Sequence, residues 1–195
     1  NLKNLNTTSQ NSKIELTRLN SSILFQDVGA IILPSILFSS TQGRSDFIKV
    51  HPSAEITING DLEARHNLNI KTGLKLRNFI FTPGVNIGFL SGAMYEMNTM
   101  IGDGNCNSYI SLFSTPGGAA ARFINQSGFE LNYIQIRDIN LTGATANLVN
   151  SLKFGQTNGW NVLEKTNETF YWIGRNGNWS NPSNWSLNSG GPAAV

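Results

Sequence analysis

The spacing of apolar positions between Phe129 and Gly143 sets the expectation for the whole chain. A single straight strand would keep one alternation phase, because side chains on a pleated backbone repeat every two residues. In this stretch the apolar residues instead form doublets, each beginning five residues after the last. The shifts of phase predict three short strands, each pointing two side chains into a common core, with bends between them. The doublets are Phe129/Leu131, Ile134/Ile136 and Ile139/Leu141.

The same spacing recurs upstream, between Ile56 and Ile87. Successive doublets begin five or six residues apart there, and turn sequences such as Asn59-Gly60 and Thr72-Gly73 separate some of them. An amphipathic helix fits poorly, since residues i and i+2 lie on opposite sides of a helical turn. These doublets are Ile56/Ile58, Leu62/Ala64, Leu68/Ile70, Leu74/Leu76, Phe79/Phe81 and Val85/Ile87.

Regular doublets of this kind predict a coil of strands. Three doublets would make one coil of roughly 16 to 18 residues, and coils stacked at about 4.8 Å would pair their strands in parallel. Internal repetition is the sequence mark of a solenoid, so we expect an all-β chain with a β-solenoid, parallel β-helix-like fold. The main alternative is an antiparallel β-sandwich, in which each doublet is the middle of a short strand and the separators are hairpins.

Changes of composition divide the chain into four expected segments. Residues 1–50 are interpreted as the end of a preceding module or as N-terminal strands, and residues 51–163 as the solenoid domain. Residues 164–169 form a polar linker, and residues 170–195 start a further Trp/Gly/Asn-rich module that is truncated. Trp160, beside a glycine turn, is expected to cap the open end of the solenoid. The first and last residues suggest a piece of something longer.

Composition and charge exclude several partners. Only 13% of the 195 residues are charged and the net charge is +2, without clusters of lysine or arginine, so we expect no nucleic-acid partner. No segment approaches the roughly 20 apolar residues that span a bilayer, so direct membrane insertion is not expected. The single cysteine, Cys106, cannot form a disulfide within the chain and is expected to be a buried or half-buried structural thiol.

Candidate chemistry is sparse. Asp61 and Glu63, with Arg65 next along, would share the outer face of one strand, and this is the strongest indication of an enzyme. A solvated strand with a cross-charged pair is favoured, because a lyase or hydrolase needs several convergent acids. Asp103-Gly104-Asn105 supplies one carboxylate, which favours a turn over a Ca²⁺ site. His51 and His66 lack zinc-ligand spacing. We therefore expect no catalytic, cofactor-binding or metal-binding residues.

The C-terminal tail and several upstream stretches carry recognisable motifs. The tail motif consists of Tyr171-Trp172-Ile173-Gly174, Gly177-Asn178-Trp179-Ser180, Pro182, Asn184-Trp185-Ser186-Leu187 and Ser189-Gly190-Gly191. The upstream motifs are Gly104-Asn105-Cys106, Tyr109-Ile110-Ser111-Leu112, Thr115-Pro116-Gly117, Tyr133 to Ile139 and Asn158-Gly159-Trp160-Asn161. The tail resembles a sequence that opens repeated modules in very large cell-surface adhesins of gliding and related Bacteroidetes bacteria, and the upstream stretches resemble the closing half of such a module. The likeness covers roughly residues 56–191.

The resemblance implies a function as well as a fold. A chain of this kind would be a non-catalytic structural or adhesive segment on the bacterial cell surface, exported by the type IX secretion system across the outer membrane and serving attachment and gliding motility. Its expected partners are neighbouring modules of the same chain, the secretion and gliding machinery, and surface glycans.

The alternative function is a carbohydrate-active or glycan-binding β-helix. The tail tryptophans Trp172, Trp179 and Trp185 would in that case stack on sugar rings, since aromatic faces bind the C–H side of carbohydrates. Packing within the core of a further module is the favoured interpretation of the same three residues.

Overall fold

The computed structural model describes residues 12–18, 20, 22–25, 29–40, 43–49, 55–163, 169–174 and 176–192. The chain is nearly all β and divides into two compact units, Asn1–Leu163 and Glu164–Val195. Across these described segments, no helix has the length and apolar character needed to cross a membrane. The two units are described separately below.

The described residues of the first unit form eighteen strands, most of them four to six residues long. The strands are β1 (Lys13–Leu16), β2 (Ser22–Phe25), β3 (Ala30–Leu33), β4 (Ser35–Phe38), β5 (Arg44–Lys49), β6 (Glu55–Ala64), β7 (Asn67–Lys71), β8 (Leu74–Phe81), β9 (Asn86–Leu90), β10 (Met94–Ile101), β11 (Ile110–Thr115), β12 (Ala121–Asn125), β13 (Phe129–Asn132), β14 (Ile134–Arg137), β15 (Ile139–Gly143), β16 (Ala146–Val149), β17 (Leu152–Phe154) and β18 (Trp160–Leu163).

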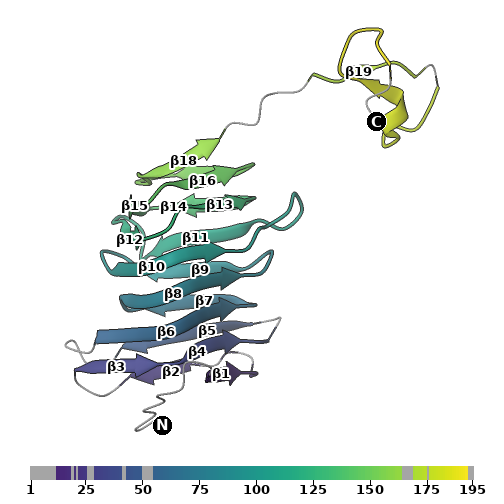
Figure 1. Ribbon diagram of the computed structural model, residues 1–195. Coiled ribbons are helices and arrows are strands. Elements are labelled where there is room, and N and C mark those ends of the chain that lie inside the picture. Colours follow the sequence, from purple (N-terminus) through teal and green to yellow (C-terminus); the bar gives the residue numbers. More distant parts are fainter. Residues whose placement is uncertain are drawn as a thin grey trace. The chain divides into compact units, whose positions relative to one another are not determined.

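Parallel pairing between successive coils makes this unit a β-solenoid of about six turns (Figure 1). One sheet has the order β1-β4-β6-β8-β10-β12-β15, with β3 also on β6, and a second has the order β17-β14-β11-β9-β7-β5-β2. A third joins β13, β16 and β18. Every strand pairing among the described residues of this unit is parallel, which confirms the predicted solenoid and rules out the antiparallel sandwich. Strands β1 to β5, from the N-terminal segment, belong to the same two large sheets.

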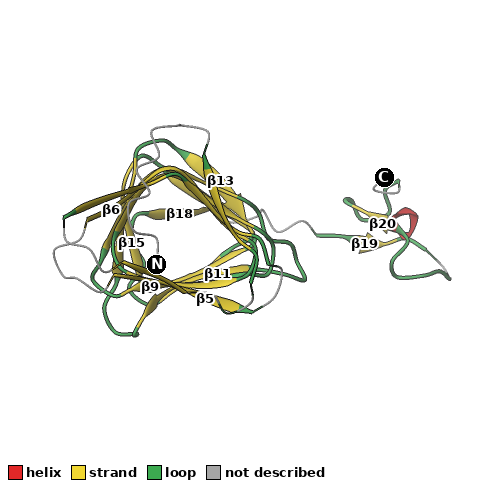
Figure 2. Ribbon diagram, turned by 90° about the horizontal axis from the view of Figure 1, so that it is seen from below, coloured by secondary structure: helices red, strands yellow, loops and turns green. Residues whose placement is uncertain are grey.

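Three faces enclose the core, as the view along the coil axis shows (Figure 2). In the middle coils one long strand covers two of the faces. The first half of β6 pairs with β3 and its second half with β4, and the register shifts between Ile58 and Asp61. Toward the C-terminus the same two faces are formed by separate strands, such as β12 and β13. One strand of the second large sheet completes each coil.

Coil length differs from the prediction in part of the chain. Ala121 pairs with Ile139, 18 positions later, and Gln135 pairs with Leu152, 17 positions later, as the doublet spacing predicts. The coil that joins Met94 to Arg122 is longer, at 28 positions. Residues 102–109 and 116–120 lie outside the strands of this coil as loops, and the chain then returns to the same register. The N-terminal coils are longer too: Lys13 pairs with Ser35, 22 positions later, and Arg44 with Asn67, 23 positions later. The range of 16 to 18 residues is therefore wrong for the N-terminal and middle coils.

Single left-handed residues form the sharp corners of the C-terminal coils. Tyr133, Asp138 and Asn150 have φ of 55°, 54° and 50°, and each separates two strands of adjacent faces. One residue in this region reverses the alternation phase, which produces the five-residue step between doublets. Asp and Asn enter the left-handed region at low cost, whereas Tyr133 is an unusual occupant. The three strands predicted for residues 129–143 are confirmed.

The core is a stack of apolar side chains along the coil axis. All six doublets from Ile56 to Ile87 are buried, and in the later stretch only Phe129 is half-buried. Phe89 and Tyr95 pack edge to face with centroids 5.0 Å apart, and both contact Phe123. The Tyr95 hydroxyl donates to the Ile70 carbonyl and accepts from the Leu90 amide, so its polar atom is satisfied within the core. Burial raises the pKa of Tyr95 strongly.

Asparagine ladders connect neighbouring coils at the surface. Asn67 Oδ1 accepts both the backbone N–H and the side-chain Nδ2 of Asn86, and Asn140 accepts the same two groups of Asn158. These bonds satisfy backbone donors where the chain turns between strands. The abundance of asparagine is therefore a structural feature of the coil.

Candidate functional site

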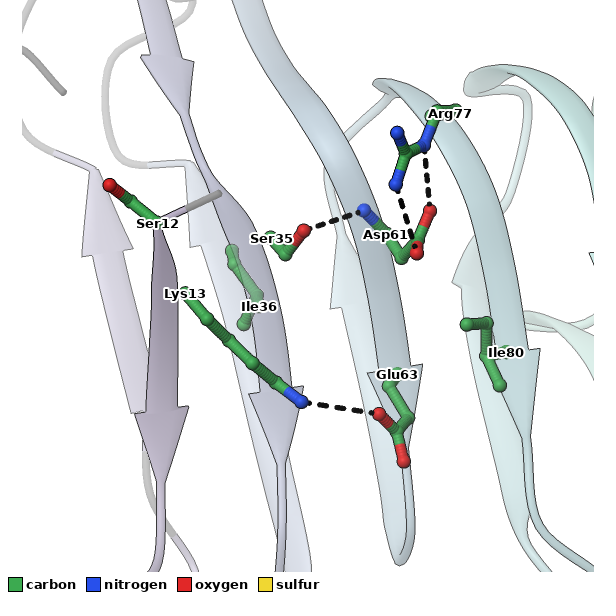
Figure 3. Close-up of a pocket in the computed structure, with 8 residues that line it drawn as sticks. All are labelled: Ser12, Lys13, Ser35, Ile36, Asp61, Glu63, Arg77 and Ile80. Atoms are coloured by element: carbon green, nitrogen blue, oxygen red, sulfur yellow. Dashed lines mark hydrogen bonds and ion pairs between the residues drawn. The ribbon is translucent and has the colours of Figure 1, made fainter. Parts of the chain in front are cut away.

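A charged depression lies on the outer face formed by β1, β4, β6 and β8. Its volume is about 260 Å³ and it is open to solvent (Figure 3). Alternation along β6 and β8 places Asp61, Glu63 and Ile80 outside, because Leu62 and Phe79 fill the core. Ile36 of β4 also lines the depression but is itself buried. The structure thus brings Asp61 and Glu63 to one surface, as predicted. The lining residues are Ser12, Lys13, Ser35, Ile36, Asp61, Glu63, Arg77 and Ile80.

Asp61 is fully engaged by its neighbours. Arg77 donates Nε and Nη2 to its two carboxylate oxygens at 3.0 and 3.2 Å, and Asn78 donates at 2.9 Å. The carboxylate of Asp61 raises the pKa of Arg77 through the hydrogen bond and its charge. On the backbone side, the Asp61 N–H donates to Ser35 Oγ at 3.1 Å. A bidentate arginine pair of this kind holds a carboxylate in one orientation.

Glu63 is likewise paired with cations. Arg65 Nε lies 2.6 Å from Oε1, and Lys13 Nζ lies 3.5 Å from Oε2. The cross-charged strand pair expected from the sequence is present, although Arg77 and Lys13, from neighbouring coils, were not predicted partners. General acid catalysis needs a carboxyl group that carries a proton, and two acids held by three cations are poorly suited to that role.

A serine–histidine pair lies inside the solenoid. Ser45 Oγ is 2.8 Å from His66 Nε2, and His66 Nδ1 is 2.8 Å from the Ser40 carbonyl oxygen. If Nδ1 donates to that carbonyl, Nε2 accepts the Ser45 hydroxyl, which is the arrangement of a nucleophile and its base. Ser45 and His66 are 1% and 3% exposed, so a substrate cannot reach them. The pair links two coils, and sequence reasoning missed it because the residues are 21 positions apart.

The structure does not bring the remaining candidate metal ligands together within the described part of the chain. Asp103 accepts the Asn132 N–H at 2.7 Å, which connects its loop to β13, and Asn105 accepts the Asn107 N–H at 3.0 Å within a turn. The described part of the chain holds no group of three or more His, Cys, Asp or Glu side chains suited to a metal ion. His51 lies outside the described residues.

Cys106 corrects one expectation. Its thiol is exposed, in the loop between β10 and β11, and is not the buried or half-buried structural group that the sequence suggested. The loop leaves the coil at Gly102, where a side chain would overlap the Phe81 carbonyl. Burial is the ordinary expectation for a lone cysteine, and it fails here because the residue lies in a loop outside the coil.

The last strand of the solenoid contains Trp160. This residue is 4% exposed, and its ring packs against Phe123 and Phe129 with centroids 6.3 and 6.1 Å away. Its Nε1 donates to the Ile139 carbonyl at 3.0 Å. The indole therefore fills the core of the C-terminal coil.

The second unit gathers the three tail tryptophans around a two-stranded sheet. Strands β19 (Tyr171–Trp172) and β20 (Trp185–Ser186) are antiparallel, with the 3-10 helix η1 (Pro182–Asn184) before β20. The rings of Trp172 and Trp179 lie 14° from parallel with centroids 6.1 Å apart. Trp185 stands nearly perpendicular to both, at 5.2 and 4.4 Å. The three tryptophans singled out in the sequence therefore lie in one cluster.

Searches of the chain against protein families, curated proteins and solved structures returned no match in any of the three. The function is therefore argued from the residues and their geometry.

Proposed function

We propose that the chain is a non-catalytic structural and adhesive segment of a very large cell-surface adhesin. In this proposal it acts outside the cell, on a bacterium of the gliding Bacteroidetes type, as a type IX secretion substrate that serves surface attachment and gliding motility. Its partners are neighbouring modules of the same protein, the outer-membrane secretion and gliding machinery, and surface glycans.

The observation that carries this proposal is the outer surface of the solenoid, whose coils are hydrogen-bonded to one another and whose acids are paired with cations. Parallel coils bonded along one axis form a stiff rod-like element, since each coil hydrogen-bonds to the next. The most acid-rich part of that surface consists of Asp61 and Glu63, and both carboxylates are held by cations from their own or neighbouring coils. A stiff element whose surface acids are occupied by ion pairs suits a spacer or an adhesive segment.

Attachment of coated beads tests this function. Beads carrying the chain should adhere to glass and to polysaccharide-coated surfaces under flow better than beads carrying serum albumin. The variant Asp61→Asn/Glu63→Gln is the matched control, and it should adhere equally well because the two acids have only structural partners. Attachment no better than that of the albumin beads would refute the adhesive function.

The second candidate is a carbohydrate-active β-helix, and the surface position of Asp61, Glu63 and Arg65 favours it. Incubation with pectate and alginate, followed by ultraviolet detection of unsaturated products and by a reducing-end assay, separates the two functions. We expect no products. Cleavage that disappears in Asp61→Asn/Glu63→Gln would establish the enzyme instead.

A further inference from the structure

Trp179 in the tail unit is the most exposed large apolar side chain of the described residues, at 75%. Its neighbours in the cluster are more covered: Trp172 is 39% exposed and Trp185 is half-buried. A partner that covered this indole would gain the hydrophobic free energy of removing its surface from water.

The turn that presents Trp179 is built by specific contacts. Trp185 Nε1 donates to the Trp179 carbonyl at 2.9 Å, and the two rings meet edge to face at 4.4 Å. Asn184 Nδ2 donates to the Asn178 carbonyl at 3.0 Å. Gly177 lies so close to the Asn184 amide that a side chain would overlap it. The backbone on both sides of Trp179 is thereby fixed, and binding would not have to order it first.

Exposed amides flank the ring. Asn178 Oδ1 accepts the Ser180 N–H at 3.2 Å, and Asn181 Oδ1 accepts the Ser183 N–H at 3.0 Å. Within the described part of the tail, neither Nδ2 group donates a hydrogen bond, so both are available to an oxygen acceptor. A flat aromatic face beside amide donors matches a pyranose ring, whose C–H face packs on the negative ring face while its hydroxyls accept hydrogen bonds.

The charge of the tail distinguishes between neutral and acidic polysaccharides as ligands. Between Thr169 and Pro192 the sequence has a single charged residue, Arg175. Acidic polysaccharides are recognised through clusters of cations, which this stretch lacks. We propose that Trp179 is the stacking platform of a binding site for neutral pyranose polysaccharides, with Asn178 and Asn181 as its hydrogen-bonding groups. The inference rests on the proposed adhesive function and names the ligand class.

Affinity electrophoresis of the whole 195-residue chain tests the site. The gels contain a neutral β-glucan, mannan, xylan or galactan, and pectate and alginate serve as acidic comparators. At least one neutral polymer should retard the chain. Trp179→Ala should weaken binding roughly 2- to 12-fold, because an aromatic contact contributes about 0.5–1.5 kcal/mol. Trp179→Phe should keep most of the binding, since it retains an aromatic face.

Leu187→Ala is the matched control in the same unit, because Leu187 is 51% exposed and apolar. It should bind like the parent chain. Three results would overturn the site: binding only to the acidic polymers, equal losses in Trp179→Ala and Leu187→Ala, or no retardation by any neutral polymer. Self-association in sedimentation experiments that Trp179→Ala abolishes, without polysaccharide binding, would identify a second copy as the occupant and also overturn the proposal.

The bead assay separates failure of this site from failure of the adhesive function. Beads that adhere equally with the parent chain and with Trp179→Ala, in the absence of glycan binding, would overturn the tail site and leave the adhesive function standing. A chain that binds neutral polysaccharide in solution but gives no bead attachment would overturn the adhesive function and support the site.

Discussion

Replacing Phe89 with alanine should severely destabilise the solenoid. Phe89 is fully buried, and its ring contacts Phe79, Tyr95 and Phe123 at centroid distances of 5.8, 5.0 and 4.7 Å. An aromatic side chain that buries about 150–250 Å² at about 25 cal/mol per Å² contributes about 4–6 kcal/mol, which is an upper bound because unfolded chains already bury some surface. We therefore expect a loss of about 3–5 kcal/mol in the free energy of unfolding.

Phe154→Ala is the matched control, since Phe154 is 48% exposed on the last strand of the same sheet. It should cost less than about 1 kcal/mol. Urea unfolding followed by far-ultraviolet circular dichroism measures both variants on the signal of the strands. If the two substitutions cost the same within about 1 kcal/mol, Phe89 does not occupy the shared core that the coil stack requires.

Three further predictions concern turns, charge and the outer surface. Gly159→Ala should cost about 1–3 kcal/mol more than Gly92→Ala in thermal unfolding: both residues have positive φ, but only at Gly159 would a side chain overlap a backbone atom, the Leu141 carbonyl oxygen. Partial burial alone would raise the pKa of Asp46, but hydrogen bonds from Lys71 and Asn69 and the charges of Lys71 and Arg44 outweigh it and lower the pKa below 3.8. The stability that Asp46 contributes is thus present above pH 3.8 and is lost as the pH falls through the lowered pKa. In acid titrations, Asp46→Asn should cost under about 1 kcal/mol at pH 7 and nothing at lower pH, where Asp46 is protonated. A cost that persists at pH 2 would contradict this. Arg77→Ala should leave Asp61 with fewer partners and lower the melting temperature by only a few degrees in calorimetry, since the pair is at the surface.

Much of the fold was predictable from the doublets. Their period fixes which side chains enter the core, and the change of phase after Leu131 and after Ile136 corresponds to corners at Tyr133 and Asp138. Coil length could not be predicted for the N-terminal and middle coils. The sequence predicts a turn at Asp103-Gly104-Asn105, but it does not give the length that the loop of residues 102–109 adds to its coil, because the apolar pattern resumes when the strand returns to register.

The candidate sites were predictable only in part. Alternation along β6 is enough to place Asp61 and Glu63 on one face, with Arg65 next along, but Lys13 and Arg77 come from neighbouring coils, and that pairing depends on register. The Ser45–His66 contact and the exposure of Cys106 depend on where loops re-enter the coil. The spacing of apolar residues along the sequence does not show where a loop re-enters the coil.

The register of the coils defines the solenoid, and spin-label distances along one outer column measure it directly. The labels would be placed in the Cys106→Ser background, one pair at Arg44 and Ser111 and a second pair at Arg44 and Leu152. Neighbouring coils pair Arg44, Asn67, Asn86, Ser111, Gln135 and Leu152 in that order. The first pair of labels is therefore three rungs apart and the second five, where one rung is the step from a strand to its partner in the next coil. At about 4.8 Å per rung, the two backbone separations should be about 14 and 24 Å. Distances that rise by two rungs between the pairs would support the solenoid. A Leu152 label no farther from Arg44 than the Ser111 label would contradict it.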